Sequence, residues 1–114
     1  VLFHSFNPDH PVSAGFGEFR ISLDENFGVT PTHESTVELF RTTGQQDKRR
    51  DIAGWCCEQG NGRVVGIVAG HTWDPWWNPV IRELHWRGAH WAMNRDIPSF
   101  EPPKEAMPWA ESGY

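Results

Sequence analysis

The chain has 114 residues, enough for one domain with a modest hydrophobic core. Its net charge of −5, with 10 Lys and Arg against 15 Asp and Glu, argues against a general nucleic-acid-binding protein. No apolar run approaches the ~20 residues that a membrane-spanning helix needs. We therefore expect neither nucleic acid nor a membrane as a partner.

The first predicted elements are strands. The segment 1–17 contains several turn-forming Asn, Pro and Gly residues, which indicates a loop that follows a strand end. Phe19, Ile21 and Leu23 then alternate with polar residues, which is the two-residue period of a half-buried strand. A second strand is expected over 37–43, where Thr and apolar residues are frequent.

Two further strand-like runs, 52–58 and 63–69, enclose a turn rich in Gly and Asn at 59–62. Gly and Asn tolerate positive φ, so these runs predict a β-hairpin. The second run is almost continuously apolar from Val64 to Val68. It is therefore expected to be an internal strand of an α/β sheet, buried on both faces.

A helix is predicted from Pro79 to about Asn94, because Asn78 is a good N-cap and Pro suits the first helical turn. The prolines that follow forbid regular structure. The chain thus divides into a domain over 1–94 and a Pro-rich tail over 95–114. One face of the helix is expected to pack on the core at helical spacing: Ile81, Leu84, Gly88, Trp91 and Ala92.

Cys56 and Cys57 are adjacent, and neighbouring side chains on a strand point to opposite faces. A disulfide between them is therefore not expected, and both are interpreted as buried strand residues. A reducing, cytoplasmic location is favoured, and no signal peptide is visible. Because the chain begins at Val1, an export signal can have been removed.

The main candidate for a functional side chain is His71, which follows the most apolar predicted strand. In α/β sheets, ligands bind outside the carboxyl ends of strands, so His71 is a candidate general acid, general base or metal ligand. The alternative is a histidine that only holds the turn by bonding neighbouring backbone. Asp24 and Glu25, at the end of an earlier predicted strand, can supply a carboxylate to the same cleft.

Three tryptophans at 73, 76 and 77 precede the predicted helix. Exposed, they would form an aromatic wall that stacks on a sugar; buried, they would be a hydrophobic plug under the loop. A His/Glu/His set could also hold a divalent metal. However, no short-range ligand spacing such as HExxH or CxxC supports a metal site.

Several short motifs resemble, in family order, the C-terminal part of ThuA-like (trehalose-utilisation) domains. The hairpin strand, the turn and the helix end of that family are matched here by Gly62-Arg63-Val64-Val65, Gly70-His71-Thr72 and Arg87-Gly88-Ala89-His90-Trp91-Ala92. Upstream, His10-Pro11-Val12-Ser13-Ala14-Gly15 and Asp24-Glu25-Asn26-Phe27 match two more motifs, although Phe27 stands where the family has Tyr.

The resemblance implies a flavodoxin-like α/β fold of the class I glutamine-amidotransferase-like superfamily. Here it would be a partial or shortened version with a β-hairpin and a C-terminal helix. The N-terminal half of the family's domain is absent, which implies a homo-oligomer or a partner chain that supplies that half.

The resemblance also implies carbohydrate utilisation, with a disaccharide or keto-sugar as ligand. We favour an enzyme, a hydrolase or isomerase that zinc can assist. Carried over, His71 is the general acid/base, Glu25 its carboxylate partner or a metal ligand, and His10 a ligand or substrate hydrogen-bonder. Chemistry adds Asp24, Trp73 and Trp76 to the substrate-binding set. The alternatives are a non-catalytic carbohydrate-binding or accessory domain and a structural fragment of a larger assembly.

Overall fold

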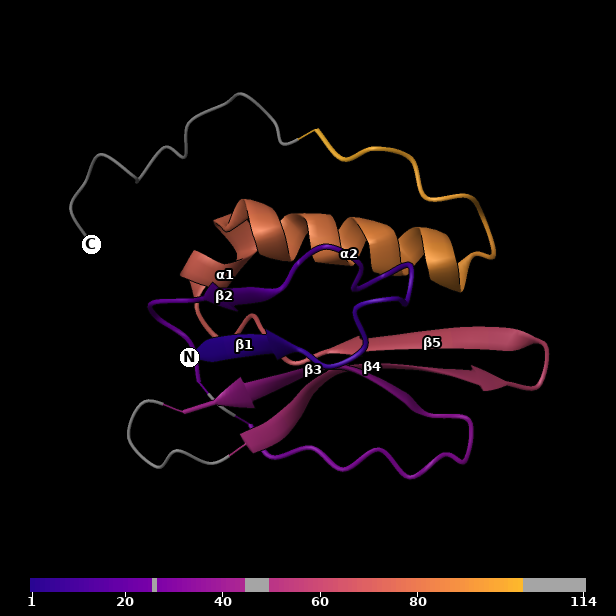
Figure 1. Cartoon of the computed structure of the whole chain (residues 1–114), viewed down its shortest axis with the longest axis horizontal. Helices are drawn as coiled ribbons and strands as arrows, with labels where there is room; N and C mark the ends of the chain where they lie inside the picture. The colour runs from indigo at the N-terminus through magenta and orange to yellow at the C-terminus, as the bar shows by residue number, and fades with distance from the viewer. Residues whose placement is uncertain (26, 45–49, 102–114) are drawn as a thin grey trace.

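The computed structural model describes residues 1–25, 27–44 and 50–101. Over these residues, one antiparallel sheet is covered on one face by a long helix (Figure 1). The strands lie in the order β2-β1-β3-β4-β5, and each neighbouring pair is antiparallel. Their bounds are β1 Leu2–Ser5, β2 Glu18–Arg20, β3 Val37–Thr43, β4 Arg50–Gln59 and β5 Gly62–Ile67; the helices are α1 Trp73–Trp77 and α2 Pro79–Ala92.

The expected α/β class is confirmed at the level of a small mixed domain, whereas the position predicted for the apolar run 64–68 is wrong. β5 is an edge strand with β4 as its one neighbour in the described sheet. Its inner face packs on α2, where Gly88 lets Val65 approach closely, while Val64 stays 43% exposed. An apolar run can therefore occupy an edge when a helix covers one of its faces.

The two middle strands and the hairpin follow the sequence pattern. β3 begins and ends where it was expected, and β4 and β5 are joined by a two-residue turn at Gly60-Asn61. Gly60 has φ +58°, the conformation that the first position of such a hairpin turn favours. The strand expected around Phe19 is only three residues long, and β1 lies between it and β3.

Helix α2 begins and ends through local signals. The Asn78 side chain accepts a hydrogen bond from the Val80 backbone N–H at 2.9 Å, which confirms the predicted N-cap. At the other end, Asn94 has φ 53° and the Arg95 N–H donates to the His90 carbonyl at 3.0 Å. This is a Schellman arrangement, and it folds the following segment back along the helix.

The returning segment, 95–100, is called the strap below. The indole Nε1 of Trp86 donates to the Pro98 carbonyl at 3.1 Å, and the rings of Trp86 and Phe100 lie 6.2 Å apart. The ring of Phe100 therefore anchors the strap on α2. Residues 102–114 of the predicted tail lie outside the described residues.

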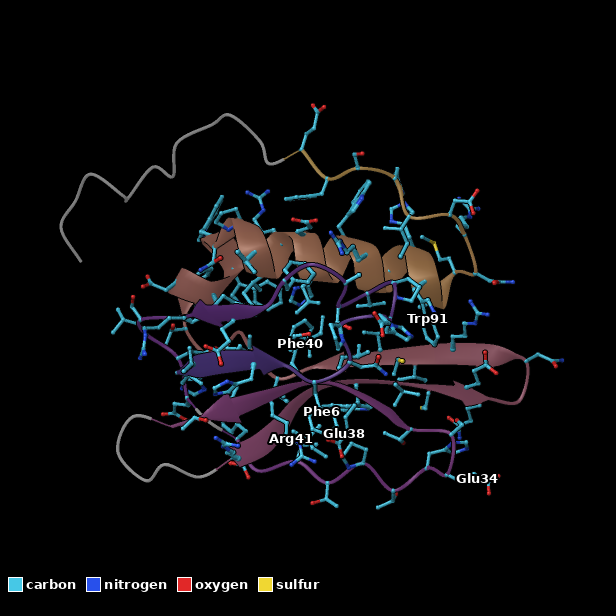
Figure 2. All side chains as sticks on the ribbon, in the orientation of Figure 1. Phe6, Glu34, Glu38, Phe40, Arg41 and Trp91 are labelled. Atoms are coloured by element: carbon cyan, nitrogen blue, oxygen red, sulfur yellow. The ribbon has the colours of Figure 1, made fainter. Side chains whose placement is uncertain are left out.

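The core lies between α2 and the sheet. Ile81 and Leu84 are fully buried, and Phe40 points from β3 toward α2 (Figure 2). Phe3 and Phe19 stack at 4.9 Å between β1 and β2. On the other face of the sheet, Phe6 lies under the Arg41 guanidinium, which also pairs with Glu38. Among the described residues, neither helix has the length and apolar character to cross a membrane.

Candidate functional site

Asp24 holds together two loops that leave opposite edges of the sheet. The antiparallel pairings make β2 and β5 run in the same direction, so both strands end on the same side of the sheet. The Asp24 carboxylate accepts hydrogen bonds from the backbone N–H groups of Gly70 and His71, both at 3.1 Å. The Thr72 hydroxyl donates to the Leu23 carbonyl beside them. Hydrogen bonds thus join the segments around Asp24 and Gly70, which are 46 positions apart in the chain.

The imidazole of His71 is not what holds this turn. Its backbone N–H is bonded, whereas its ring Nε2 lies 3.9 Å from the Glu25 carboxylate and its ring centroid 5.6 Å from that of Phe27. The side chains of His71 and Glu25 are 51% and 61% exposed. An imidazole beside a carboxylate can accept or deliver a proton at a ligand bound on this surface.

Two tryptophans stand exposed beside His71. Trp73 is 74% exposed and Trp76 is 49% exposed, whereas Trp77 is half-buried. The Trp76 indole donates to the Gly70 carbonyl at 3.0 Å, and its ring passes so close that a Cβ at Gly70 would meet it at 2.9 Å. Glycine at this position, with φ +125°, lets the ring lie flat on the turn. Trp73 and Trp76 are therefore an exposed aromatic wall and not a buried hydrophobic plug.

We call this surface the His71 face; it consists of Asp24, Glu25, Phe27, His71, Trp73 and Trp76. A cavity of about 400 Å³ adjoins it between the chain after β2 and α1. Ser22 and Asp74 line that cavity together with Trp77. Hydroxyl and carboxylate groups beside an aromatic ring suit a polyhydroxylated ligand, which needs hydrogen-bond partners and a flat apolar face.

His10 lies elsewhere. Its ring contacts that of Trp91, in the last turn of α2, with centroids 5.4 Å apart. The His71 face lies beside α1, which precedes the other end of α2, and α2 has 14 residues and is therefore about 20 Å long. The structure thus brings Asp24, Glu25, His71 and Trp76 together but does not bring His10 to them.

His10 instead pairs with Cys56 of β4, at 3.3 Å between Nε2 and Sγ. The His10 Nδ1 accepts the Val12 N–H at 3.2 Å, so the proton of the neutral ring lies on Nε2 and points at the sulfur. Burial lowers the pKa of His10 and raises the pKa of the Cys56 thiol to about 11. A neutral imidazole beside a protonated thiol is a structural pair and not an activated nucleophile.

The residues that the structure describes do not fit a zinc ion. A protein zinc site takes at least three side-chain ligands. In 1–25, 27–44 and 50–101, no group of three or more His, Cys, Asp or Glu side chains lies close enough to hold a metal. At the His71 face, the Asp24 oxygens already accept backbone N–H groups, which leaves His71 and Glu25.

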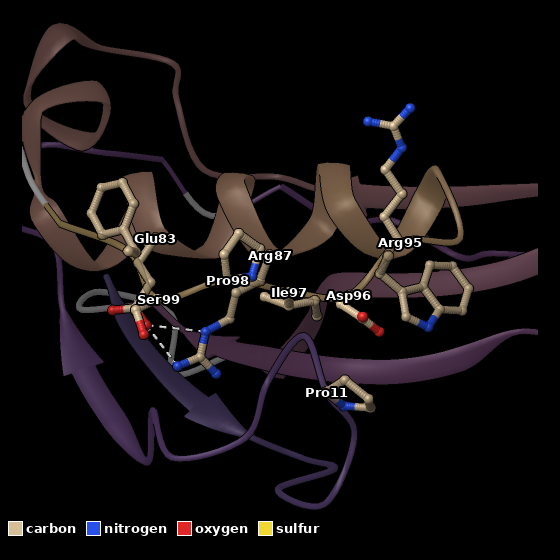
Figure 3. Close-up of a pocket in the computed structure, with 10 residues that line it drawn as sticks. Pro11, Glu83, Arg87, Arg95, Asp96, Ile97, Pro98 and Ser99 are labelled. Atoms are coloured by element: carbon tan, nitrogen blue, oxygen red, sulfur yellow. Dashed lines mark hydrogen bonds and ion pairs between the residues drawn. The ribbon is translucent and has the colours of Figure 1, made fainter.

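A second cavity, of about 480 Å³, lies between α2 and the strap (Figure 3). Three residues of α2 line it at four-residue spacing: Glu83, Arg87 and Trp91. Both Nε and a terminal nitrogen of Arg87 donate to one Glu83 oxygen, at 3.0 and 2.6 Å. These three residues are not among the site residues predicted from the sequence, although their four-residue spacing on one helix face is a local signal that marks them.

No family model, curated protein or solved structure matches this chain.

Proposed function

We propose that the chain serves carbohydrate utilisation and that the His71 face binds a sugar, a disaccharide or keto-sugar as the ThuA-like resemblance implies. The observation that supports the proposal most directly is the contact between Asp24 and the 70–71 backbone. It joins two segments that carry separate motifs of the resemblance and sets them beside two exposed tryptophans. The same resemblance supports the finer flavodoxin-like assignment only if the parallel strands belong to the half of the domain that a partner chain would supply, because every strand pair described here is antiparallel.

In the proposed complex, Trp73 and Trp76 stack on the apolar faces of the sugar rings. In the adjoining cavity, the Asp74 carboxylate accepts hydrogen bonds from sugar hydroxyl groups, and the Ser22 hydroxyl donates or accepts. His71 exchanges a proton with a sugar oxygen, and Glu25 orients the imidazole and stabilises its charged form. Asp24 contributes as the residue that positions the backbone of the turn.

A non-catalytic sugar-binding domain is the second candidate, and one observation favours it. The His71 and Glu25 side chains are both more than half exposed and lie 3.9 Å apart, so water competes for each of them. Catalytic groups usually act where water is excluded and their geometry is tight. Stacking on Trp73 and Trp76 does not need that exclusion.

A titration with trehalose, maltose and their keto derivatives, followed by amide and indole NMR shifts, tests the proposal. We expect shifts at the His71 face, and Trp73→Ala to weaken binding about fivefold or more. Phe6→Ala is the matched control, because Phe6 is 55% exposed on the face of the sheet opposite α2. If Trp73→Ala and Trp76→Ala bind every sugar as tightly as the parent chain, the proposal is wrong.

Two further variants separate enzyme from binding domain. If His71→Gln and Glu25→Gln abolish sugar turnover but keep sugar binding, the His71 face is catalytic. If sugars bind but neither the parent chain nor these variants turn them over, the domain is a binding module.

A further inference from the structure

The cavity under the strap is built by identifiable contacts. Asn94 turns the chain back, the Trp86 indole holds the Pro98 carbonyl, and the strap then runs along α2 beside the loop that carries Pro11 (Figure 3). The volume of about 480 Å³ is within the usual range of ~300–1,000 Å³ for small-molecule sites. Local capping and one indole hydrogen bond thus create a site of ligand size.

Part of the wall of this cavity is apolar or aromatic, among polar and charged groups. Trp91 contributes from α2, Ile97 and Phe100 from the strap, and Pro11 from the opposite loop. Trp91 and Phe100 offer π faces or edges to a ligand, and Ile97 and Pro11 offer aliphatic surface. A ligand bound here can therefore rest an apolar body on these four residues, while its polar groups meet the rest of the wall.

Four charged residues line the cavity: Glu83, Arg87, Arg95 and Asp96. The Arg87 guanidinium donates hydrogen bonds to the Glu83 carboxylate and, at 2.6 Å, to the Ala14 carbonyl. Asp96 has no hydrogen-bond or ion-pair partner for its carboxylate among the described residues. In Figure 3 its carboxylate extends toward Pro11, whereas the Arg95 guanidinium extends away from it. An unneutralised carboxylate thus stands at an aromatic-lined cavity.

We propose that this cavity binds a small organic cation, a primary ammonium carried on an apolar body. The Asp96 carboxylate and the free oxygen of Glu83 accept hydrogen bonds from the ammonium group, which Trp91 and Phe100 further stabilise through cation–π attraction. Pro11 and Ile97 pack on the apolar body. The site is independent of the sugar proposed for the His71 face, because none of its lining residues belongs to that face.

The test is an NMR titration of the full chain with benzylammonium, benzyl alcohol and benzoate as probes. We expect benzylammonium to shift the backbone amides of Asp96, Ile97, Ser99 and Phe100 and the Trp91 indole. Benzyl alcohol, which has the same body without the charge, is expected to bind about fivefold more weakly, and benzoate more weakly still. Raising the salt concentration is expected to weaken the binding of benzylammonium and to leave that of benzyl alcohol unchanged.

Asp96→Asn removes the charge with almost no change of shape, and no contact that supports the fold is lost, because the side chain is exposed. We expect this variant to bind benzylammonium about fivefold more weakly and benzyl alcohol unchanged. Glu34→Gln, an exposed acid on the far side of the sheet, is the matched control and is expected to change neither. Equal affinities for benzylammonium and benzyl alcohol, or an unaffected Asp96→Asn, would overturn the proposal. So would benzylammonium shifts at Trp73 and Trp76 in place of Trp91.

Discussion

Gly66 is the position where a single methyl group should reveal the packing of the outer sheet face. Gly66 of β5 pairs in register with Trp55 of β4. Val65, its neighbour, faces Gly88 of α2, so Gly66 faces the other side of the sheet. A Cβ at Gly66 would lie 2.2 Å from the Trp55 ring, a distance that no real contact allows. Gly66→Ala must therefore push the indole off the strand.

The expected cost follows from the burial that the indole loses. A tryptophan buries roughly 150–250 Å², worth about 4–6 kcal/mol at ~25 cal/mol per Å². Trp55 is half-buried, so displacing it forfeits about half of that, ~2–3 kcal/mol. Replacing glycine by alanine in an element returns roughly 0.5–1 kcal/mol of chain entropy. We expect Gly66→Ala to lower the free energy of unfolding by about 2 kcal/mol.

Urea unfolding followed by far-UV circular dichroism measures this effect in a double-mutant cycle. The cycle compares the parent chain, Gly66→Ala, Trp55→Ala and the double variant. In the Trp55→Ala background the methyl group meets no ring, so Gly66→Ala should cost nothing or be slightly stabilising. An equal cost in both backgrounds, or a cost below about 0.5 kcal/mol in the parent chain, would refute the steric explanation.

Three more outcomes follow from single contacts. Asn78→Ala removes the acceptor for the Val80 N–H and should lower the free energy of unfolding by about 1 kcal/mol, while Asn78→Asp retains it; urea unfolding distinguishes them. Burial lowers the pKa of His10 in the folded chain. The contribution of its neutral imidazole to the free energy of unfolding is therefore present above pH 6.5 and is lost as the pH falls through the folded-state pKa. His10→Gln should therefore flatten the loss of stability measured between pH 7 and 5. Burial raises the pKa of the Cys56 thiol from 9.0 to about 11, so iodoacetamide at pH 8 should label Cys56 only as fast as the chain unfolds. The stability that the protonated thiol contributes is present below pH 9 and is lost as the pH rises from 9 through 11. Labelling of Cys56 in native conditions as fast as in urea, by mass spectrometry, would contradict the burial of that thiol.

The elements that sequence analysis predicted well are those whose signals lie within a few residues. The N-cap Asn78, the Pro at the first turn and the apolar spacing of Ile81 and Leu84 place α2 almost to the residue. The turn at Gly60-Asn61 likewise defines the β4–β5 hairpin, because positive φ is a local requirement. We also expected Asp24 and His71 to lie close together. That expectation came from the rule that ligands bind at the carboxyl ends of strands in parallel sheets, and this sheet is antiparallel.

Contacts between distant residues depended on the tertiary structure. The apolar pattern of 64–68 shows that the strand packs on something, but an edge strand under a helix and an internal strand have the same composition. Likewise, nothing near His10 in the sequence points to Cys56, 46 positions away, and nothing near Trp86 points to Pro98 as its hydrogen-bond partner.

Local signals in the sequence place the hairpin turn and the ends of the long helix, because capping, turn conformation and helical periodicity act over three or four residues. The order of the strands, the separation of His10 from His71 and the cavity between α2 and the strap depend instead on how distant parts of the chain pack. Those features arise when many weak long-range contacts are satisfied together, and no single residue encodes them.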